Sequence, residues 1–171
     1  MEGINDIISK LELAQICWVV KDIHAAVDFF SKSLGIAGFP SPEIVRAQDL
    51  EMSYRGEVVA GEWLTTQAYN GLTFVELVQP LSGQSMFHDY LKQYLAGGAQ
   101  HFAYRLPVSN FEEVVGKFQA NGYEIISEVD HPIARMAFFD TYESIGAVTE
   151  IMGITPEGWN AVEQMKNGNG Q

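Results

Sequence analysis

AQHFAYRLP, residues 99–107, is an apolar stretch with one histidine, His101, near its start. A similar stretch, AQICWVVK, occupies residues 14–21. Each stretch is followed by a helical pattern that ends near a glycine, and then by several strand-like segments. The last segment of each copy has one acidic residue in an apolar run, Glu76 in LTFVELV and Glu150 in AVTEIMG. The sequence therefore predicts two copies of a βαβββ unit in an α+β protein.

The chain divides into five predicted segments. Their bounds follow from helical periodicity, strand alternation and turn residues. They are an N-terminal helix at 1–12, a first βαβββ module at 13–80, a linker helix at 81–98, a second βαβββ module at 99–153, and a C-terminal helix and tail at 154–171.

The stretch from Gln15 to Glu76 in the first module is longer than the stretch from His101 to Glu150 in the second. Pro40 and Pro42 interrupt regular structure, and we expect the extra length in a loop at 38–48. Strands are predicted at 50–54, 61–68 and 72–78, with the hairpin signal Asn70-Gly71 between the last two.

Composition excludes several classes of protein. Ten basic and twenty-two acidic residues give a net charge of −12, and no cluster of Lys and Arg is available to bind nucleic acid. No apolar run reaches the eighteen residues of a membrane span, so we expect no membrane partner. Cys17 is the single cysteine, which excludes an internal disulfide and favours a cytoplasmic location. We expect Cys17 to lie in the core.

Four polar residues occupy matching places in the two predicted modules: Gln15 and His101 on the first strands, and Glu76 and Glu150 on the last. Singly, each has an ordinary explanation as a hydrogen-bonded core residue or a solvent-facing one. A glutamate in an apolar strand costs several kcal/mol to bury unless it is paired or bound to a metal. One nitrogen and three oxygens suit a divalent ion such as Zn, Ni, Co or Mn.

The other polar and aromatic candidates carry weaker signals. His24, His88 and His131 have no metal-site spacing and are expected at the surface, as are two arginines. Several aromatic residues and a methionine lie in predicted strands, where they form either the wall of a cavity for a hydrophobic small molecule or ordinary core. The two arginines are Arg46 and Arg135. The residues in predicted strands are Trp18, Met52, Tyr54, Trp63 and Phe74.

The order of these motifs resembles a known superfamily. VVKDI after the first strand, FVELVQPL, QHFAYRL and the final TEIMG are together similar to the vicinal oxygen chelate superfamily, which includes glyoxalases, bleomycin-resistance proteins and extradiol dioxygenases. The resemblance implies two βαβββ modules that form a glyoxalase-like open barrel around a divalent metal. It also implies that Gln15, Glu76, His101 and Glu150 are the metal ligands.

The ligand order is similar to two kinds of member. Gln, Glu, His, Glu resembles glyoxalase I, whereas methylmalonyl-CoA epimerases typically have His, Gln, His, Glu. Val19 stands where glyoxalase I has an arginine, and Pro80 stands where it has an asparagine. Val59-Ala60-Gly61 stands where the epimerases have Glu-Gln-Gly.

The function implied is that of a metal-dependent isomerase, epimerase or lyase, similar to lactoylglutathione lyase or methylmalonyl-CoA epimerase. Such an enzyme abstracts a proton next to a carbonyl of a small-molecule substrate through a metal-held enediolate. Glu150 is the first candidate for the catalytic base and Glu76 the second. A homodimer is expected by analogy. The alternative is a metal-free small-molecule binding protein of the bleomycin-resistance type, which binds a drug or natural product.

Overall fold

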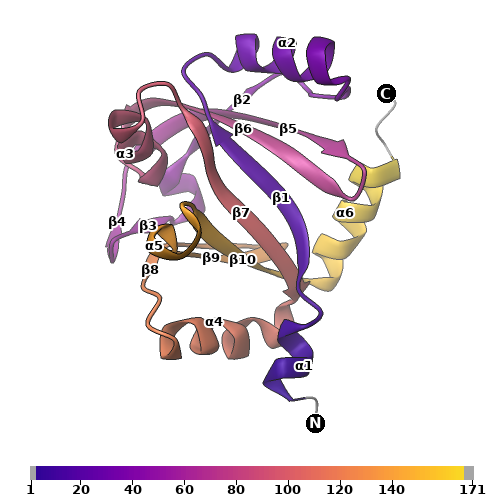
Figure 1. Ribbon diagram of the computed structural model, residues 1–171, viewed down its shortest axis with the longest axis vertical. Coiled ribbons are helices and arrows are strands. Elements are labelled where there is room, and N and C mark those ends of the chain that lie inside the picture. Colours follow the sequence, from indigo (N-terminus) through magenta and orange to yellow (C-terminus); the bar gives the residue numbers. More distant parts are fainter. Residues whose placement is uncertain (1–2, 168–171) are drawn as a thin grey trace.

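The strands form one sheet that curls into an open half-barrel (Figure 1). The computed structural model describes residues 3–167. Strands β1 (Glu12–Val19) and β7 (Gly98–Pro107) run antiparallel through the middle of the sheet. The full order is β2-β5-β6-β1-β7-β10-β9-β8-β3-β4, so each half of the chain supplies one side of the sheet, except that the short strands β3 and β4 of the first half extend the second side. The predicted α+β class and glyoxalase-like open barrel are confirmed.

The two halves repeat the same elements. In each half a first strand is followed by a helix, then by three strands, and the last of these three pairs in parallel with the first. The first half contains β1, α2 (Ile23–Leu34), β2 (Glu43–Arg46), β5 (Gly61–Asn70) and β6 (Thr73–Gly83). The second half contains β7, α4 (Phe111–Ala120), β8 (Ile125–His131), β9 (Ala134–Phe139) and β10 (Val148–Ile154).

The repeat extends to the register of individual residues. Glu76 on β6 pairs with Cys17, two residues beyond Gln15 on β1. Glu150 on β10 pairs with Ala103, two residues beyond His101 on β7. Because side chains two apart on a strand share a face, each glutamate lies on the face of its module's first-strand polar residue. The central pairing of β1 with β7 then joins the two pairs of polar residues.

The predictions of a loop at 38–48 and of a strand at 50–54 hold only in part: residues 38–42 have no regular structure, and Ser53–Tyr54 form a strand, β3. Residues 43–46 form β2, which pairs with β5 at the edge of the sheet. The extra length lies instead at 47–60, which includes the 3-10 turn η1 (Ala47–Leu50) and the short strands β3 (Ser53–Tyr54) and β4 (Glu57–Val58). Strand β3 pairs with β8 of the other half, a long-range contact that local periodicity cannot reveal.

The long helices α2 and α4 lie on the outer side of the sheet at opposite ends of the molecule (Figure 1). Helix α2 packs Ile23 and Phe30 into an apolar cluster with Leu77 of β6. Helix α4 packs Phe111 and Val114 into a cluster that contains strand residues of the second half. The apolar spacing that predicted both helices is therefore the spacing that fixes them to the sheet.

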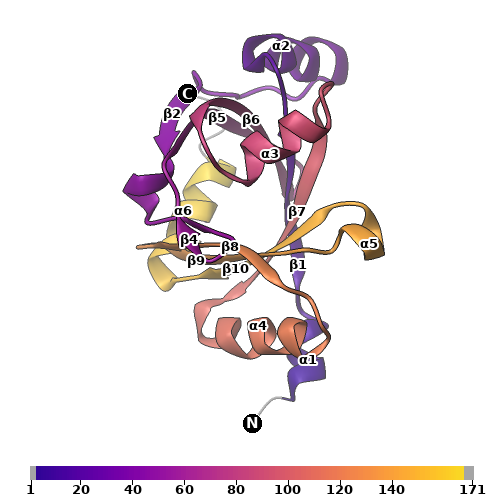
Figure 2. The same ribbon diagram turned by 90° about the vertical axis from the view of Figure 1, so that its left-hand side faces the viewer.

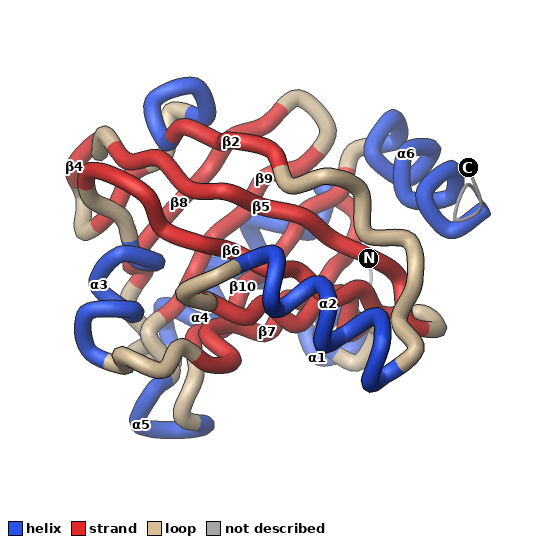
Figure 3. The backbone as a smooth tube through the Cα atoms, turned by 90° about the horizontal axis from the view of Figure 1, so that it is seen from above, coloured by secondary structure: helices blue, strands red, loops and turns tan. Residues whose placement is uncertain are grey.

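The remaining helices connect and close the two halves. Helix α6 lies on the open side of the half-barrel, between the two sides of the sheet (Figure 2). From above, β2, β5 and β6 run side by side, and α6 lies beyond one end of them (Figure 3). Within residues 3–167, none of the helices has the length and apolar character needed to cross a membrane. The helices not yet given are α1 (Ile4–Ile8), α3 (Met86–Gln93), η2 (Val108–Asn110), α5 (Tyr142–Ile145) and α6 (Pro156–Asn167).

Candidate metal centre

The four polar residues at matching positions meet on the inner face of the sheet. The Nε2 atom of Gln15 lies 2.6 Å from Glu76 Oε2 and 2.9 Å from His101 Nε2. His101 Nε2 lies 3.0 Å from Glu150 Oε2 and 3.8 Å from Glu76 Oε2. Gln15, His101 and Glu150 are buried, whereas Glu76 keeps 20% of its side chain exposed. The strand register therefore assembles one cluster from four strands and both halves of the chain.

The imidazole of His101 is oriented by its neighbour. Nδ1 donates to the Oε1 atom of Gln100 at 2.6 Å, and Gln100 is 1% exposed. This hydrogen bond uses the proton on Nδ1 and leaves Nε2 facing the cluster, where this nitrogen is positioned to bind a cation. Metal-binding histidines use the same arrangement, in which the outer nitrogen donates to a fixed acceptor.

The cluster has more acceptors than donors. The lone pair of His101 Nε2 faces the carboxylate of Glu150 at 3.0 Å, and Glu76 brings a second carboxylate to the same point. The amide group of Gln15 donates to two of these acceptors but carries no charge. Buried carboxylates that face a lone pair require a proton or a cation between them.

A divalent cation fits this donor set. Metal bonds of about 2.0–2.1 Å to nitrogen and oxygen place neighbouring ligand atoms about 2.9 Å apart in octahedral geometry and about 3.3 Å apart in tetrahedral geometry. The separations in the cluster run from 2.6 to 3.8 Å, so they bracket both values. Rotation of the Gln15 amide about its last bond brings Oε1 to the position of Nε2 and supplies the third oxygen.

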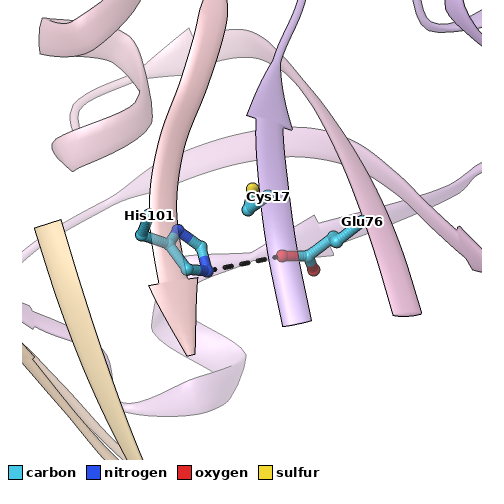
Figure 4. Close-up of side chains that lie close together, drawn as sticks. All are labelled: Cys17, Glu76 and His101. Atoms are coloured by element: carbon cyan, nitrogen blue, oxygen red, sulfur yellow. Dashed lines mark ion pairs between the residues drawn. The ribbon is translucent and has the colours of Figure 1, made fainter. Parts of the chain in front are cut away.

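A second triad overlaps this cluster. Among the described residues, one potential ligand atom from each of Cys17, Glu76 and His101 lies within 4.8 Å of the other two. Figure 4 shows the imidazole of His101 and the carboxylate of Glu76 pointing toward one another, with Cys17 on β1 between their strands. Burial raises the pKa of the Cys17 thiol well above its usual range, and the charge of Glu76 raises it further. The thiol is therefore neutral at pH 7 without a metal, in agreement with the expected core position.

Burial also changes the acidity of Glu76. Removal from water raises the pKa of this carboxyl, and Glu150 raises it further, whereas His101 lowers it. Thr65 Oγ1 donates to Glu76 Oε1 at 3.2 Å. A carboxyl with a raised pKa is suited to accept and return a proton near neutral pH.

The cluster forms the polar wall of a cavity of about 330 Å³. Both halves of the sheet line this cavity, and α6 contributes Gly158, Ala161, Val162 and Met165. Most of the remaining lining is apolar, so the polar cluster sits at one part of an otherwise hydrophobic space. Such a cavity suits a small molecule with a large apolar part.

The aromatic and methionine candidates divide into two groups. Trp63, Phe74 and Met52 line the cavity, as one of the two sequence interpretations predicted. Trp18 packs in the cluster under α2, and Tyr54 donates to Asp89 away from the cavity. Alternation places Trp18 on the opposite face of β1 from Gln15, but it could not show that Tyr54 lies away from the cavity.

Two of the three histidines expected at the surface are not there. His88 is 7% exposed and its Nδ1 lies 2.8 Å from Ser85 Oγ, while His131 lines the cavity. His24 is exposed, as predicted. Arg46 and Arg135 pair at the surface with glutamates, which also agrees with the sequence.

Sequence reasoning missed several residues of the site. Gln100 gave no signal because it lies at a register shift between β1 and β7, where simple strand alternation does not hold. Arg105 is 4% exposed and lines the cavity, although it reads as an ordinary strand residue. Helix α6 was predicted, but nothing local indicated that it covers the cavity.

Comparisons with solved structures agree on this fold. The chain is similar to methylmalonyl-CoA epimerase from Mycobacterium tuberculosis, with 16% identity over 85% of this chain and 89% of that one, and a TM-score of 0.61. It is also similar to a hypothetical protein from Bacillus halodurans C-125, with 22% identity over 84% of this chain and 94% of that one, and a TM-score of 0.60.

A third structure is a Streptomyces coelicolor methylmalonyl-CoA epimerase variant in complex with 2-nitronate-propionyl-CoA. The match has 16% identity, covers 84% of this chain and 94% of that one, and has a TM-score of 0.58. At these identities the likeness establishes the fold. No curated protein sequence matches the chain.

Family membership follows from the sequence itself. Residues 14–138 match the model of the glyoxalase/bleomycin resistance protein/dioxygenase superfamily. The matched region covers most of the chain and includes the first three residues of the polar cluster, Gln15, Glu76 and His101. The last, Glu150, lies at the equivalent position of the second half. The chain belongs to the glyoxalase/bleomycin resistance protein/dioxygenase superfamily.

Proposed function

We propose that the protein is a divalent-metal-dependent isomerase, epimerase or lyase that removes a proton from the carbon next to a carbonyl. The observation that carries this proposal is the meeting of two glutamates, Glu76 and Glu150, at one nitrogen of His101 inside a mainly apolar cavity. The similarity of the fold to methylmalonyl-CoA epimerases supports it.

Gln15, Glu76, His101 and Glu150 would hold the metal ion. When bound, the ion supplies Lewis-acid stabilisation for negative charge on a substrate oxygen. The acceptor excess of the cluster supports this assignment, because the two carboxylates and the Nε2 lone pair are satisfied together by a cation. Zn, Ni, Co and Mn all accept this donor set.

Glu150 is the proposed base. It lines the cavity with 2% exposure, so its carboxylate meets a bound substrate without competing water. It takes the proton from the carbon next to the carbonyl and returns it to the same carbon or to its neighbour. Glu76 is the second carboxylate of the cavity, and its raised pKa suits it to carry a proton on the other side of the reaction.

The apolar residues of the cavity wall contribute to the proposed reaction by excluding water. Met52, Trp63 and Phe74 exclude water around the reacting carbon, which strengthens every electrostatic interaction there. Water exclusion also protects a carbanion-like substrate from unwanted protonation.

The first test is metal content. Inductively coupled plasma mass spectrometry on tag-free protein is expected to find about one equivalent of a divalent metal after incubation with Zn, Ni, Co or Mn. The Glu76→Ala, Glu150→Ala double variant is expected to bind none. Absence of metal uptake by the folded wild type would contradict the proposal.

The second test is proton exchange. In D₂O, the metal-loaded wild type is expected to exchange the acidic hydrogen of methylmalonyl-CoA, or to convert the hemithioacetal of methylglyoxal and glutathione, as followed by NMR. Glu150→Gln removes the base with little change in volume, so we expect a loss of at least 100-fold in rate. Full activity in this variant would contradict the role of Glu150.

The alternative function is metal-free binding of a small molecule, as in the bleomycin-resistance branch of the superfamily. The mainly apolar cavity beside α6 favours it. A wild type that takes up no metal but binds hydrophobic compounds tightly would establish this alternative.

A further inference from the structure

Arg105 is a buried cation that the proposed proton transfer does not use. It lies on β7 four residues after His101, which corresponds to about 13 Å along an extended strand. Its register partner on β1 is Glu12, and its guanidinium pairs with that residue. The charge of Arg105 is therefore held at a distance from the metal cluster, yet Arg105 lines the same cavity.

The hydrogen bonds of Arg105 are incomplete. Nε donates to Glu12 Oε2 at 3.1 Å, and Nη2 lies 3.1 Å from the same oxygen in an ion pair. Among the described residues, Nη1 is buried and has no hydrogen-bond partner. A buried, unpaired donor on a charged group is costly, so this nitrogen needs an acceptor that a ligand can supply.

A second unpaired donor lies nearby. The hydroxyl of Tyr69 is also buried without a partner in residues 3–167. Burial raises the pKa of this hydroxyl, whereas the charge of Arg105 and a side-chain interaction with Arg105 lower the pKa, which places the two groups next to each other. The guanidinium of Arg105 also lies over the ring of Trp159, with its Cζ atom 5.5 Å from the ring centroid.

The counterion Glu12 lies largely in solvent. Its side chain is 63% exposed, so water screens much of its charge, whereas Arg105 is 4% exposed. Only one oxygen of Glu12 accepts from the guanidinium. A planar carboxylate matches the free edge of a guanidinium in shape and charge.

The cavity limits the charge of this ligand. Of the described residues that line it, Arg105 is the one arginine or lysine. A single guanidinium that already carries one counterion suits a monoanion better than a phosphate ester or a polyphosphate. The residues Phe74, Ala134 and Met152, which also line the cavity, make the wall apolar.

We propose that Arg105, with Tyr69 beside it, binds the carboxylate of a small amphiphilic acid whose reacting carbonyl lies at Glu150. An apolar alkyl or aryl segment separates the carboxylate from the carbonyl. The position of the carbonyl at Glu150 rests on the function proposed above, whereas binding of the carboxylate is measured without turnover.

The test is titration calorimetry of the full chain, metal-free and Mn-loaded, with 4-phenylbutyrate and its neutral isostere 4-phenylbutyramide. We expect the wild type to bind the acid at least 10-fold more tightly than the amide. Arg105→Met is expected to weaken the acid at least 10-fold and to leave the amide unchanged. Arg135→Met, which removes an exposed arginine outside the cavity, is the matched control and keeps wild-type affinities.

Glu12→Gln is the complementary variant. It frees Arg105 from its counterion at an exposed position, so the acid is expected to bind several-fold more tightly while the amide is unaffected. If Arg105→Met does not fold, Glu12→Gln tests whether Arg105 binds the carboxylate. An unchanged acid affinity in folded Glu12→Gln overturns the proposal.

Other outcomes also overturn it. Equal affinities for acid and amide in the wild type would show that the cavity recognises no carboxylate. Tighter binding of 3-phenylpropyl phosphate than of the acid would assign Arg105 to phosphate esters instead.

The two proposals fail separately. Carboxylate binding that depends on Arg105 in a protein that takes up no metal would leave this site in place and remove the metal-dependent function. Metal uptake, together with acid binding that does not depend on Arg105, would remove this carboxylate site and leave the metal-dependent function in place.

Discussion

The imidazole of His101 presents an unprotonated nitrogen to the cluster because Gln100 fixes the proton on the other side of the ring. That one hydrogen bond decides whether His101 can bind a cation or must instead donate to Glu150. The neighbouring residue on β7 thus controls the chemistry of His101.

Gln100→Leu is predicted to weaken metal binding about 10- to 100-fold, because the ring of His101 loses its fixed tautomer and orientation. Gln100→Glu is expected to restore affinity, since a carboxylate accepts the same Nδ1 proton. Competition with a fluorescent chelator measures both. Gln119→Leu on the exposed face of α4 is the control, and equal affinities in Gln100→Leu and wild type would exclude the orienting role.

His88 gives a second prediction at this scale. Burial lowers the pKa of its imidazole from the ordinary value of 6.5, so the folded state binds this proton less readily than the unfolded chain. The associated stability is present above pH 6.5 and is lost as the pH falls through the lowered pKa. Urea unfolding from pH 7.5 to 5 is expected to show a smaller loss in His88→Asn than in the wild type.

The control for this pH series is His24→Asn, which alters an exposed histidine of α2 and should retain the wild-type slope. A His88→Asn protein whose stability falls as steeply as that of the wild type would reject the assignment.

At the scale of elements, the fold depends on how closely each helix approaches its neighbours. Gly158 in α6 lies so near the backbone that an added Cβ would come 2.1 Å from the carbonyl oxygen of Ile133. Gly116 in α4 has open space around it. The same residue type therefore has a packing role in one helix and none in the other.

Alanine substitutions at these two glycines are predicted to have opposite signs. Gly116→Ala should stabilise the protein by roughly 0.5–1 kcal/mol, because alanine favours the helix more than glycine does. Gly158→Ala should destabilise it and displace α6, with weaker binding of cavity ligands. Urea unfolding compares the two, and stabilisation by Gly158→Ala would show that α6 does not pack as described.

At the scale of the whole molecule, the candidate ligands come from β1, β6, β7 and β10, which belong to both halves of the chain. A cation bound by all four connects the two modules through the centre of the sheet. The proposed metal site would therefore link the two modules as well as serve as the proposed reaction centre.

Metal binding is predicted to stabilise the complete fold. At a free metal concentration 100-fold above Kd, the gain is about 2.7 kcal/mol, which corresponds to a rise of roughly 5–10 °C in Tm for a chain of this size. Differential scanning calorimetry with and without EDTA measures it. The Glu76→Ala, Glu150→Ala variant should show no metal-dependent shift, and an equal shift in that variant would place the metal elsewhere.

The internal repeat was visible in the sequence, but its literal match is out of register by one residue. Aligning the two AQ pairs would equate Gln15 with Gln100, whereas the strand pairing equates Gln15 with His101. The prediction that Gln15 corresponds to His101 rested on their places on the first strands of the two modules, and the pairing agrees with it.

Other parts of the site could not be predicted from local pattern. Strand β3 joins the far half of the sheet, and α6 folds over the cavity, through contacts between segments distant in the chain. Arg105 pairs with the exposed Glu12 of another strand and lines the cavity. The residues next to Arg105 in the sequence indicate neither contact.

The sequence by itself determined the α+β class, the two βαβββ modules and the four polar residues on their first and last strands. Alternation and helical spacing are local properties, so the residues alone can carry them. Only the tertiary structure decided the orientation of His101, the closure of the cavity by α6 and the burial of Arg105. These depend on distances between segments far apart in the chain, which packing of the whole sheet alone can set.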